Sequence, residues 1–379
     1  MTMLADYAVT LEGLKRKARL RSLAPRLGLD FTSNDFLGLA NSPRLKAAIR
    51  TAMERGVPVG AAGSRLLRGN HPEHEALETE AAAFFGAERA LYLGSGYMAN
   101  VALFSTLPRR DDLILHDALI HASAHEGIAA SKAASVSITH NVASAFDVAI
   151  RNWRKNGGKG RPWIAVESLY SMDGDRAPLS ELAAIAESHD GFLVIDEAHA
   201  TGVLGADGRG LASDLEGREN IVVLHTCGKA LGVSGALLAA PKILADYLVN
   251  RARAFIYSTA PSPLMTAGVR EALRIVQDEP ERREALRDLV AFTGEELAQR
   301  FGIMPSGSHI QPIIIGSNAR ALQIAEALQA QDFDIRAIRP PTVPESTARL
   351  RVSITLNVSQ QQIYDMLECL TQALKENNK

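Results

Sequence analysis

The segment LVIDEAHATG, residues 193–202, begins as a buried strand and ends in charge. Aliphatic residues run directly into Asp196 and Glu197, and His199 follows three positions after Asp196. An acid at the end of a buried strand has two interpretations. One is a nucleotide-hydrolysing motor, because DEAH is also a helicase motif. The other is a site for a cofactor with a positively charged ring nitrogen, which a carboxylate holds in that state.

The surrounding chain predicts the fold. Short, mostly aliphatic runs recur through its middle, at residues 90–96, 112–119, 135–140, 163–168, 192–198, 221–226 and 235–240. Continuous apolar runs are typical of strands that are covered on both faces. Spacings of roughly 20–30 residues leave room for crossover helices, such as one predicted over 179–188. We therefore expect an α/β fold with a mostly parallel sheet flanked by helices.

The C-terminal part has a different pattern, which predicts a smaller α+β domain. Residues 319–331 form a predicted helix, and RLRVSIT (349–355) alternates between apolar and polar residues. Strict alternation favours a half-exposed strand of an antiparallel sheet, with Arg349, Arg351 and Ser353 on the exposed face. The predicted divisions are an N-terminal arm at 1–36, a large domain at 37–275 and a C-terminal domain at 276–379.

Composition narrows the possible partners. The 379-residue chain has a formal net charge of −2, so no basic surface indicates nucleic acid. The two cysteines lack metal-binding or disulfide spacing, which fits a reducing compartment. The N-terminus has no apolar run, and the longest uncharged stretch, between Lys229 and Lys242, is too short for a membrane span. We expect a cytoplasmic protein without nucleic-acid or membrane partners.

The motor interpretation lacks its phosphate-binding loop. Such a loop ends in Gly-Lys followed by Ser or Thr, whose hydroxyl binds magnesium. The Gly-Lys pairs of this chain, at 158–159 and 228–229, are followed by Gly160 and Ala230. The helicase interpretation of DEAH is therefore disfavoured.

Lys229 favours the cofactor interpretation. It follows the strand predicted at 221–226, so Lys229 and Asp196 lie after consecutive predicted strands, at the edge where α/β sheets bind ligands. Pyridoxal 5′-phosphate (PLP) requires this pair, because a lysine forms its Schiff base and a carboxylate keeps its ring nitrogen protonated. The plainer alternatives are a solvated lysine and an aspartate that caps the next helix.

Further residues fit the same cofactor. Its phosphate needs amide and hydroxyl donors at a helix N-terminus, which Gly96, Tyr97 and Thr226 can supply. His121 follows another predicted strand and can stack on the ring.

The ordered set of motifs resembles the α-oxoamine synthases, PLP enzymes that condense an amino acid with an acyl thioester and release carbon dioxide. The resemblance implies the aspartate-aminotransferase fold type (fold type I). The similarity runs from about Phe31 to Leu356 and includes TSNDFLG (32–38), GSRLLRGNHPEHEALE (63–78), GSGYMAN (94–100), HASAHEG (121–127), SLYSMDGDRAPL (168–179), VIDEAHATGVLG (194–205), TCGKALGVSG (226–235) and FIYSTAPSP (255–263). Within the family, AIRPPTVPESTARLR (337–351) and the short chain favour the biotin-pathway member, which uses L-alanine and a pimeloyl thioester. Members that act on glycine or serine, and a non-catalytic relative, are the alternatives.

The resemblance implies roles for individual residues. Lys229 matches the Schiff-base lysine, Asp196 the partner of the ring nitrogen, and His199 the partner of the phenolic oxygen. The remaining cofactor positions are Gly96, Tyr97, His121, Ser171 and Thr226, with Ser258 or Thr259 reaching the phosphate from a second subunit of a homodimer. Asn34, Arg339 and Thr342 match substrate-facing positions. An arginine of the N-terminal arm also binds substrate, and Arg21 is the first choice over Arg19 or Arg26.

Two pairs of histidines and Cys227 could indicate other kinds of site. His121 with His125 and His71 with His74 have spacings that suit a metal, but neither pair has a third ligand nearby in the sequence. We therefore expect no metal. Cys227 is interpreted as a packed residue, since no basic partner besides Lys229 is evident.

Overall fold

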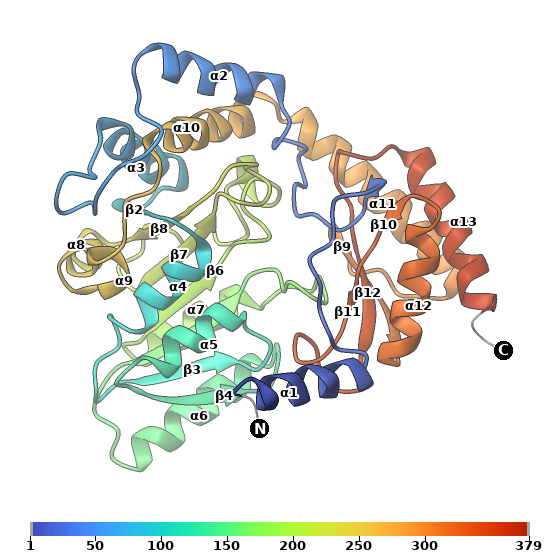
Figure 1. The fold of residues 1–379 in the computed structure, drawn as a ribbon. Coiled ribbons are helices and arrows are strands. Elements are labelled where there is room, and N and C mark those ends of the chain that lie inside the picture. The colour runs from blue at the N-terminus through green and yellow to red at the C-terminus, as the bar shows by residue number, and fades with distance from the viewer. Residues whose placement is uncertain (1–2, 377–379) are drawn as a thin grey trace. The chain divides into compact units, whose positions relative to one another are not determined.

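The computed structural model describes residues 3–376, which form two compact units (Figure 1). The sheet unit comprises Leu37–Ser171 and Arg176–Arg283. The terminal unit comprises the chain up to Phe36, the short segment Met172–Asp175, and the chain from Glu284 onward. The domain limits predicted from the sequence stay predictions.

A seven-stranded sheet forms the centre of the sheet unit and confirms the predicted α/β architecture. Its order is β2-β8-β7-β6-β5-β3-β4, and the strands from β7 to β4 are parallel. Only β8 runs against its neighbours β7 and β2. The strands are β2 (Arg89–Leu93), β3 (Leu113–Asp117), β4 (Ala134–Ile138), β5 (Pro162–Glu167), β6 (Phe192–Asp196), β7 (Ile221–Thr226) and β8 (Ala236–Ala240).

Helices cover both faces of this sheet, which explains the continuous apolar runs. Successive side chains of a strand point to opposite faces. In β6, Val194 belongs to one buried cluster, while Leu193 and Ile195 belong to another. The first cluster includes residues of α4 (Gly96–Phe104), α5 (Ala122–Ala129), α8 (Lys242–Arg251) and α9 (Arg253–Ile256), and the second includes residues of α6 (Ala143–Lys155) and α7 (Leu179–Ser188).

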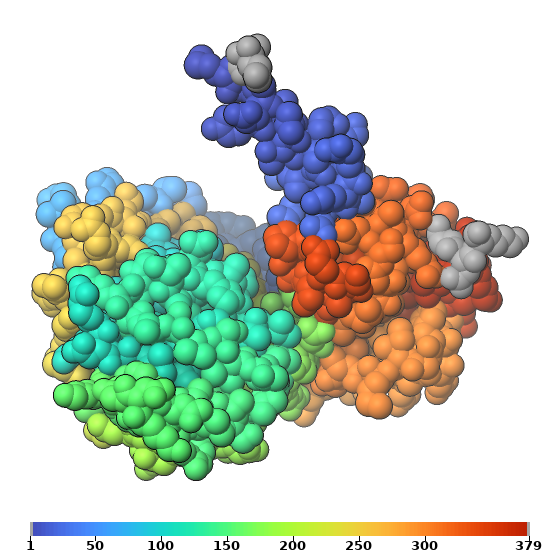
Figure 2. All heavy atoms as spheres, turned by 90° about the horizontal axis from the view of Figure 1, so that it is seen from below, coloured from blue at the N-terminus to red at the C-terminus, as the bar shows by residue number. Residues whose placement is uncertain are grey.

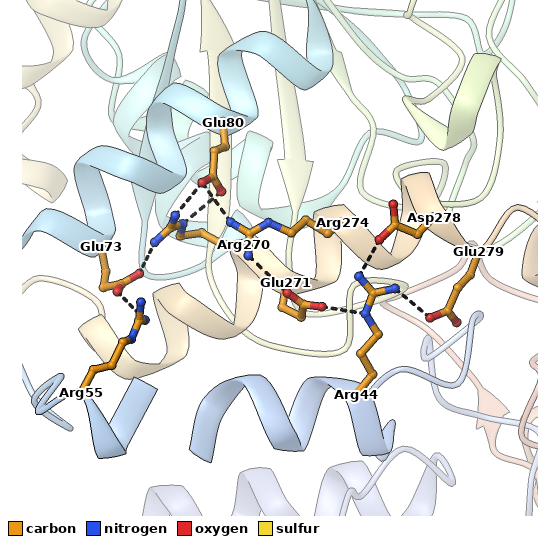
Figure 3. A network of polar contacts seen from close by, with 9 residues as sticks. All are labelled: Arg44, Arg55, Glu73, Glu80, Arg270, Glu271, Arg274, Asp278 and Glu279. Atoms are coloured by element: carbon orange, nitrogen blue, oxygen red, sulfur yellow. Dashed lines mark hydrogen bonds and ion pairs between the residues drawn. The ribbon is translucent and has the colours of Figure 1, made fainter. Parts of the chain in front are cut away.

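Ion pairs join three further helices of the sheet unit, α2 (Pro43–Glu54), α3 (Pro72–Phe85) and α10 (Pro263–Asp278), as Figure 3 shows. Arg270 of α10 contacts Glu73 at 2.5 Å and Glu80 at 2.6 Å, both on α3. Arg44 of α2 contacts Glu271 and Asp278 of α10, each at 2.6 Å. Charged side chains from different helices are thus paired along one side of α10.

The terminal unit contains the predicted antiparallel sheet, with the order β11-β12-β9. Its elements are β9 (Ile310–Gly316), β11 (Ala337–Ile338), β12 (Ala348–Ser353), α12 (Asn318–Gln329), α13 (Gln360–Glu376) and most of α11 (Glu281–Phe301). In addition, β1 (Leu29–Asp30) pairs in parallel with β10 (Phe333–Asp334). The antiparallel sheet and the helix predicted at 319–331 are confirmed.

The predicted half-exposure of the strand at 349–355 is wrong. All residues of β12 are buried, including both arginines. Arg349 forms an ion pair with Asp173, and Arg351 donates a hydrogen bond to Asn34 Oδ1 at 2.9 Å. Alternation along the sequence could not reveal these polar partners, which lie far away in the chain.

The N-terminal arm begins with helix α1 (Ala5–Arg16), none of whose residues is buried. Figure 2 shows this helix, in dark blue, extending beyond the orange and red surface of its own unit. Leu4, Tyr7 and Val9 are each more than half exposed. Within residues 3–376, no helix combines the length and the apolar character that a membrane crossing requires.

Candidate active site

The carboxyl ends of three neighbouring strands lie at the candidate site. Glu167 ends β5, Asp196 ends β6, and Thr226 ends β7. The register places Glu167 directly beside Asp196. Because parallel strands end at the same edge of the sheet, these polar side chains gather there. They line a cavity together with Gly96, Tyr97, Asn100, His121, Ser123, Ala198, His199, Leu224 and Lys229.

Asp196 is buried, and both of its carboxylate oxygens accept hydrogen bonds. Asn100 donates to Oδ2 at 2.9 Å, and the Ala198 amide donates to Oδ1 at 2.9 Å. The residues that follow Asp196 form turns, so the aspartate does not cap a helix. Its carboxylate is instead fixed in one orientation at the cavity.

Lys229 and His199 meet across this cavity. Lys229 Nζ lies 2.6 Å from His199 Nε2, and His199 is buried. The loop that carries Lys229 closes by backbone bonds, from the Gly232 amide to the Lys229 carbonyl and from the Cys227 amide to the Gly235 carbonyl. Gly235 has φ +90°, and a Cβ there would lie 2.4 Å from the Tyr92 ring. A glycine is therefore required for this turn.

His121 is the N-cap residue of α5, and its orientation is fixed. Its Nδ1 accepts a hydrogen bond from the Ser123 amide at 3.2 Å and lies 2.8 Å from Ser123 Oγ. Burial lowers the pKa of His121, and the positive charge of Lys229 lowers it further against the opposing effect of Asp196. A neutral, immobilised imidazole at the cavity suits the predicted stacking role.

The N-terminus of α4 approaches the end of β7. Ser95 caps α4 by accepting a hydrogen bond from the Met98 amide at 3.1 Å. At Gly96, the next residue, a Cβ would lie 3.6 Å from Thr226 Oγ1. The helix N-terminus and the Thr226 hydroxyl thus face the same space, which is the arrangement that a phosphate group needs.

Comparison with known proteins assigns the family. Residues 27–370 match the model of the aminotransferase class I and II family. The chain belongs to this family. It is 42% identical to the 8-amino-7-oxononanoate synthase of Alkalilimnicola ehrlichii, over 96% of this chain and 95% of that protein. It is 41% identical to the 8-amino-7-oxononanoate synthase of Methylococcus capsulatus, over 93% and 90% of the two chains.

Solved structures agree with this assignment. The 8-amino-7-oxononanoate synthase of Francisella tularensis is similar with a TM-score of 0.78 and 29% identity, over 93% of this chain and 99% of that one. A structure of serine palmitoyltransferase (SPT) with PLP has a TM-score of 0.89 and 24% identity, over 99% of both chains. The predicted fold type and the resemblance to the α-oxoamine synthases are confirmed.

Some family positions named from the sequence do not line the cavity of the sheet unit. The amide of Ser171 donates to Glu167 Oε2 at 3.1 Å, so this serine contacts a residue of the cavity without lining the cavity itself. Ser258 and Thr259 are absent from the cavity lining, and the adjoining Tyr257 is 73% exposed. Their assignment to a second subunit stays a prediction.

The predicted substrate residues all belong to the terminal unit, where three of them cluster. Arg21 Nη2 donates to Thr342 Oγ1 at 3.2 Å. Burial lowers the pKa of Arg339, and the positive charge of Arg21 lowers it further. Arg339 also donates to the Ala18 carbonyl at 2.6 Å. Arg19, by contrast, is ion-paired with Glu345, which favours Arg21 as the substrate-binding arginine of the arm.

Sequence reasoning missed three polar residues of the cavity, namely Asn100, Ser123 and Glu167. Glu167 had a signal, because it ends its strand as Asp196 ends the next one. Asn100 lies one helical turn after Gly96 and so faces the same side of α4. Its partner Asp196 is 96 residues away, and no local pattern connects the two.

The histidine pairs have other partners. His74 lies 2.8 Å from the Pro261 carbonyl through Nε2 and accepts a bond from the His71 amide at 3.1 Å. His125 packs edge-on against the His116 ring. Within residues 3–376, no three His, Cys, Asp or Glu side chains are grouped to hold a metal ion. Cys227 is buried and free, and burial raises the pKa of its thiol.

Proposed function

We propose that this chain catalyses the PLP-dependent condensation of L-alanine with a pimeloyl thioester, with loss of carbon dioxide, to give 8-amino-7-oxononanoate for biotin synthesis. The contact between Lys229 and His199 beside the anchored Asp196 carries the catalytic part of the proposal. Relatives with this activity in their names, at about 40% identity over nearly the whole chain, support the choice of substrates.

The residues of the cavity fit PLP. Asp196 is held by two donors and can keep a ring nitrogen protonated. Thr226, Gly96 and the N-terminus of α4 can hold a phosphate, with Tyr97 beside them. His199 lines the cavity and can hold the oxygen on the ring, and Ser171, which contacts Glu167, is assigned the same role from the family resemblance. When bound, the cofactor supplies an electron-withdrawing ring that stabilises negative charge on the substrate carbon.

The side chains around this position can move protons. As a free amine, Lys229 would accept the proton from the α-carbon of the amino acid and later return it. His199, 2.6 Å from Lys229 Nζ, orients the amine. The buried, neutral His121 would cover one face of the ring and keep water from the reacting carbon.

The arginines of the terminal unit indicate that the substrate carries a carboxylate. Arg21 and Arg339 lie close enough to lower the pKa of Arg339, and Thr342 lies beside Arg21. A carboxylate between two guanidinium groups would relieve this repulsion and accept paired hydrogen bonds. We assign Arg339 and Thr342 to the amino acid, and Arg21 and Asn34 to the remainder of the substrate pair. Both L-alanine and a pimeloyl group carry a carboxylate.

A homodimer completes the proposal. Ser258 and Thr259 follow the exposed Tyr257, and Leu67 is 84% exposed in the same unit. In this fold type a hydroxyl residue of the second subunit reaches the phosphate, and Ser258 or Thr259 suits that role. We therefore assign Ser258 and Thr259 to the phosphate of the partner subunit, and we place the dimer in the cytoplasm, where free cysteines such as Cys227 and Cys369 stay reduced.

Product analysis tests the proposal directly. The purified protein is supplied with PLP and with L-alanine, glycine or L-serine, each against pimeloyl, succinyl, acetyl and palmitoyl thioesters. We expect the alanine–pimeloyl pair to give the highest kcat/KM and a product with the mass of 8-amino-7-oxononanoate. A preference for glycine with a short acyl group, or for serine with palmitoyl coenzyme A, would contradict the substrate assignment while leaving the cofactor assignment intact. Matched coenzyme A and carrier-protein thioesters identify the acyl carrier.

A further inference from the structure

Glu167 is a buried acid that the proposed mechanism does not use. It is 2% exposed and lines the same cavity as Asp196, His199 and Lys229. Its Oε2 accepts a hydrogen bond from the Ser171 amide at 3.1 Å. Its Oε1 is buried and has no hydrogen-bond partner among the described residues. A buried polar atom without a partner is unfavourable, and at the edge of a ligand cavity it indicates a contact that the ligand supplies.

Two acids side by side at the cavity cannot both ionise easily. The register places Glu167 beside Asp196 on the neighbouring strand. The two environments differ, because Asp196 receives donors on both oxygens and Glu167 on one. Glu167 has fewer donors to stabilise a negative charge, so it is the better site for a proton.

The other charges near Glu167 do not reverse this assignment. Burial raises the pKa of Glu167 to about 8, and the charges of Asp196 and Asp117 raise it, while Lys229 and the Ser171 amide oppose them. Asp117, at the end of β3, is held ionised by His140 at 2.8 Å and by the amides of Leu119 and Asn141. The cavity thus contains one strongly anchored carboxylate and one acid that keeps its proton at neutral pH.

We propose that Glu167 is a positioning residue that presents a neutral carboxylic acid to the cavity and donates a hydrogen bond from Oε1 to an oxygen of the bound cofactor or amino acid. This inference rests on the proposed PLP site. Glu167 would align the ligand without adding a negative charge beside Asp196. A second carboxylate would favour the charged ammonium of Lys229 and so oppose its action as a base.

Two uncharged substitutions of Glu167 test whether the residue acts as a hydrogen-bond donor or through a negative charge. Glu167→Gln keeps a donor of similar size, and Glu167→Leu keeps the size but removes the donor. We expect PLP affinity of the wild-type protein to fall as pH rises through about 8, where Glu167 ionises. The Gln variant is expected to bind PLP within about threefold of wild type at pH 7 and to lose this alkaline decline. The Leu variant is expected to bind about tenfold more weakly at each pH, since one hydrogen bond is lost.

Infrared spectroscopy of the cofactor-free protein tests the proton independently of PLP. A component of the band of protonated carboxyl groups is expected to titrate near pH 8 and to be absent from both variants. Burial also raises the pKa of Glu197 to about 7, so its component should titrate at lower pH and remain in both variants. The proposal would be overturned if, as the pH is raised, the Glu167 component of this band were already lost at pH 6. A Gln variant that binds PLP as weakly as the Leu variant would also overturn it, provided that thermal melting shows both variants to be folded. If the wild-type protein bound no PLP, the proposed function would fail, while the infrared band would still decide the state of Glu167.

Discussion

Asn100 donates a hydrogen bond to Asp196 Oδ2 at 2.9 Å, and it joins helix α4 to the end of strand β6. The same amide group lies 2.9 Å from Ser123 Oγ, so Asn100 is itself held by α5. This contact fixes the carboxylate that we assign to the ring nitrogen. It also explains why an acid can be buried at this strand end.

Asp196→Asn is expected to bind PLP but to lose about 10³-fold in kcat. An amide cannot hold the proton of the ring nitrogen, and roughly 4 kcal/mol of charge stabilisation is at stake. Asn100→Ala serves as the graded control, because it keeps the carboxylate and removes one bond, and we expect a loss of about tenfold. Steady-state rates with saturating PLP measure both. An Asp196→Asn enzyme with a near-normal rate would exclude the assigned role.

Lys229→Ala is expected to abolish the visible absorbance of the lysine-bound cofactor and to lower activity by several orders of magnitude. The reason is that Lys229 supplies both the covalent attachment and the proton acceptor. Borohydride reduction followed by peptide mass spectrometry locates the attachment in the wild-type protein. Lys159, an exposed lysine of the same unit, provides the control through Lys159→Ala, which should keep the absorbance. A reducible adduct at another lysine of the Lys229→Ala protein would refute the assignment.

Heterodimers test the second subunit's contribution. A Lys229→Ala chain and a Ser258→Ala/Thr259→Ala chain are each expected to be nearly inactive, but one site of the mixed dimer combines an intact lysine with intact hydroxyl groups. Random mixing should therefore restore up to about one quarter of wild-type activity. Activity is measured after co-refolding or co-expression with different tags. If purified mixed dimers stay as inactive as their parents, Ser258 and Thr259 do not act across the interface.

Arg339→Ala is expected to raise the KM for L-alanine strongly while leaving the absorbance of bound PLP unchanged. Its guanidinium group is assigned to the carboxylate of the amino acid, which the cofactor does not require. Arg21→Ala is the matched comparison, and it should act mainly on the KM of the pimeloyl thioester. Wild-type enzyme should prefer alanine to glycine by roughly tenfold to two-hundredfold, the value of one methyl group in a fitted pocket. If both variants changed the KM of both substrates equally, the assignment of Arg339 to the amino acid and Arg21 to the thioester would be wrong.

Arg270→Ala is expected to lower the free energy of unfolding by about 2–3 kcal/mol, because it leaves Glu73 and Glu80 without their shared partner (Figure 3). The control is Arg287→Ala, whose side chain is 70% exposed and pairs with Glu284 at 3.9 Å, so that its loss should have little effect. Urea unfolding measures both.

The effect of Arg270→Ala should depend on pH. Burial opposes ionisation of Glu80, but the hydrogen bond and charge of Arg270 hold its pKa below the usual value. A lowered pKa of an acid stabilises the folded state above the unfolded-state pKa, and this stabilisation is lost as pH falls through the folded-state pKa. The difference between wild type and variant should therefore shrink on acidification below about pH 4. A difference that stays constant down to pH 3 would mean that packing, not charge, is responsible.

The sequence by itself determined the central sheet and the family. Each predicted run of the middle segment became a strand. The runs are apolar where the strand is covered on both faces, whereas four of the five residues of the edge strand β4 are exposed. The helix predicted at 179–188 has the same limits in the structure as α7. Asp196 and Lys229 could be named from their positions after strands, since the parallel order places those ends at one edge, and His199 could be named from the family resemblance.

Only the tertiary structure decided how polar groups are partnered. Alternation predicted that Arg349 and Arg351 were exposed, yet Asp173 and Asn34 allow both to be buried. The positions of Glu167 at a strand end and of Asn100 after Gly96 place both residues near the cavity. Their contact with Asp196, which lies on another element, appears only in the folded chain. Hydrophobic burial depends on the residue itself and so appears in the sequence, whereas burial of a charge or a proton depends on a partner that only the folded chain supplies.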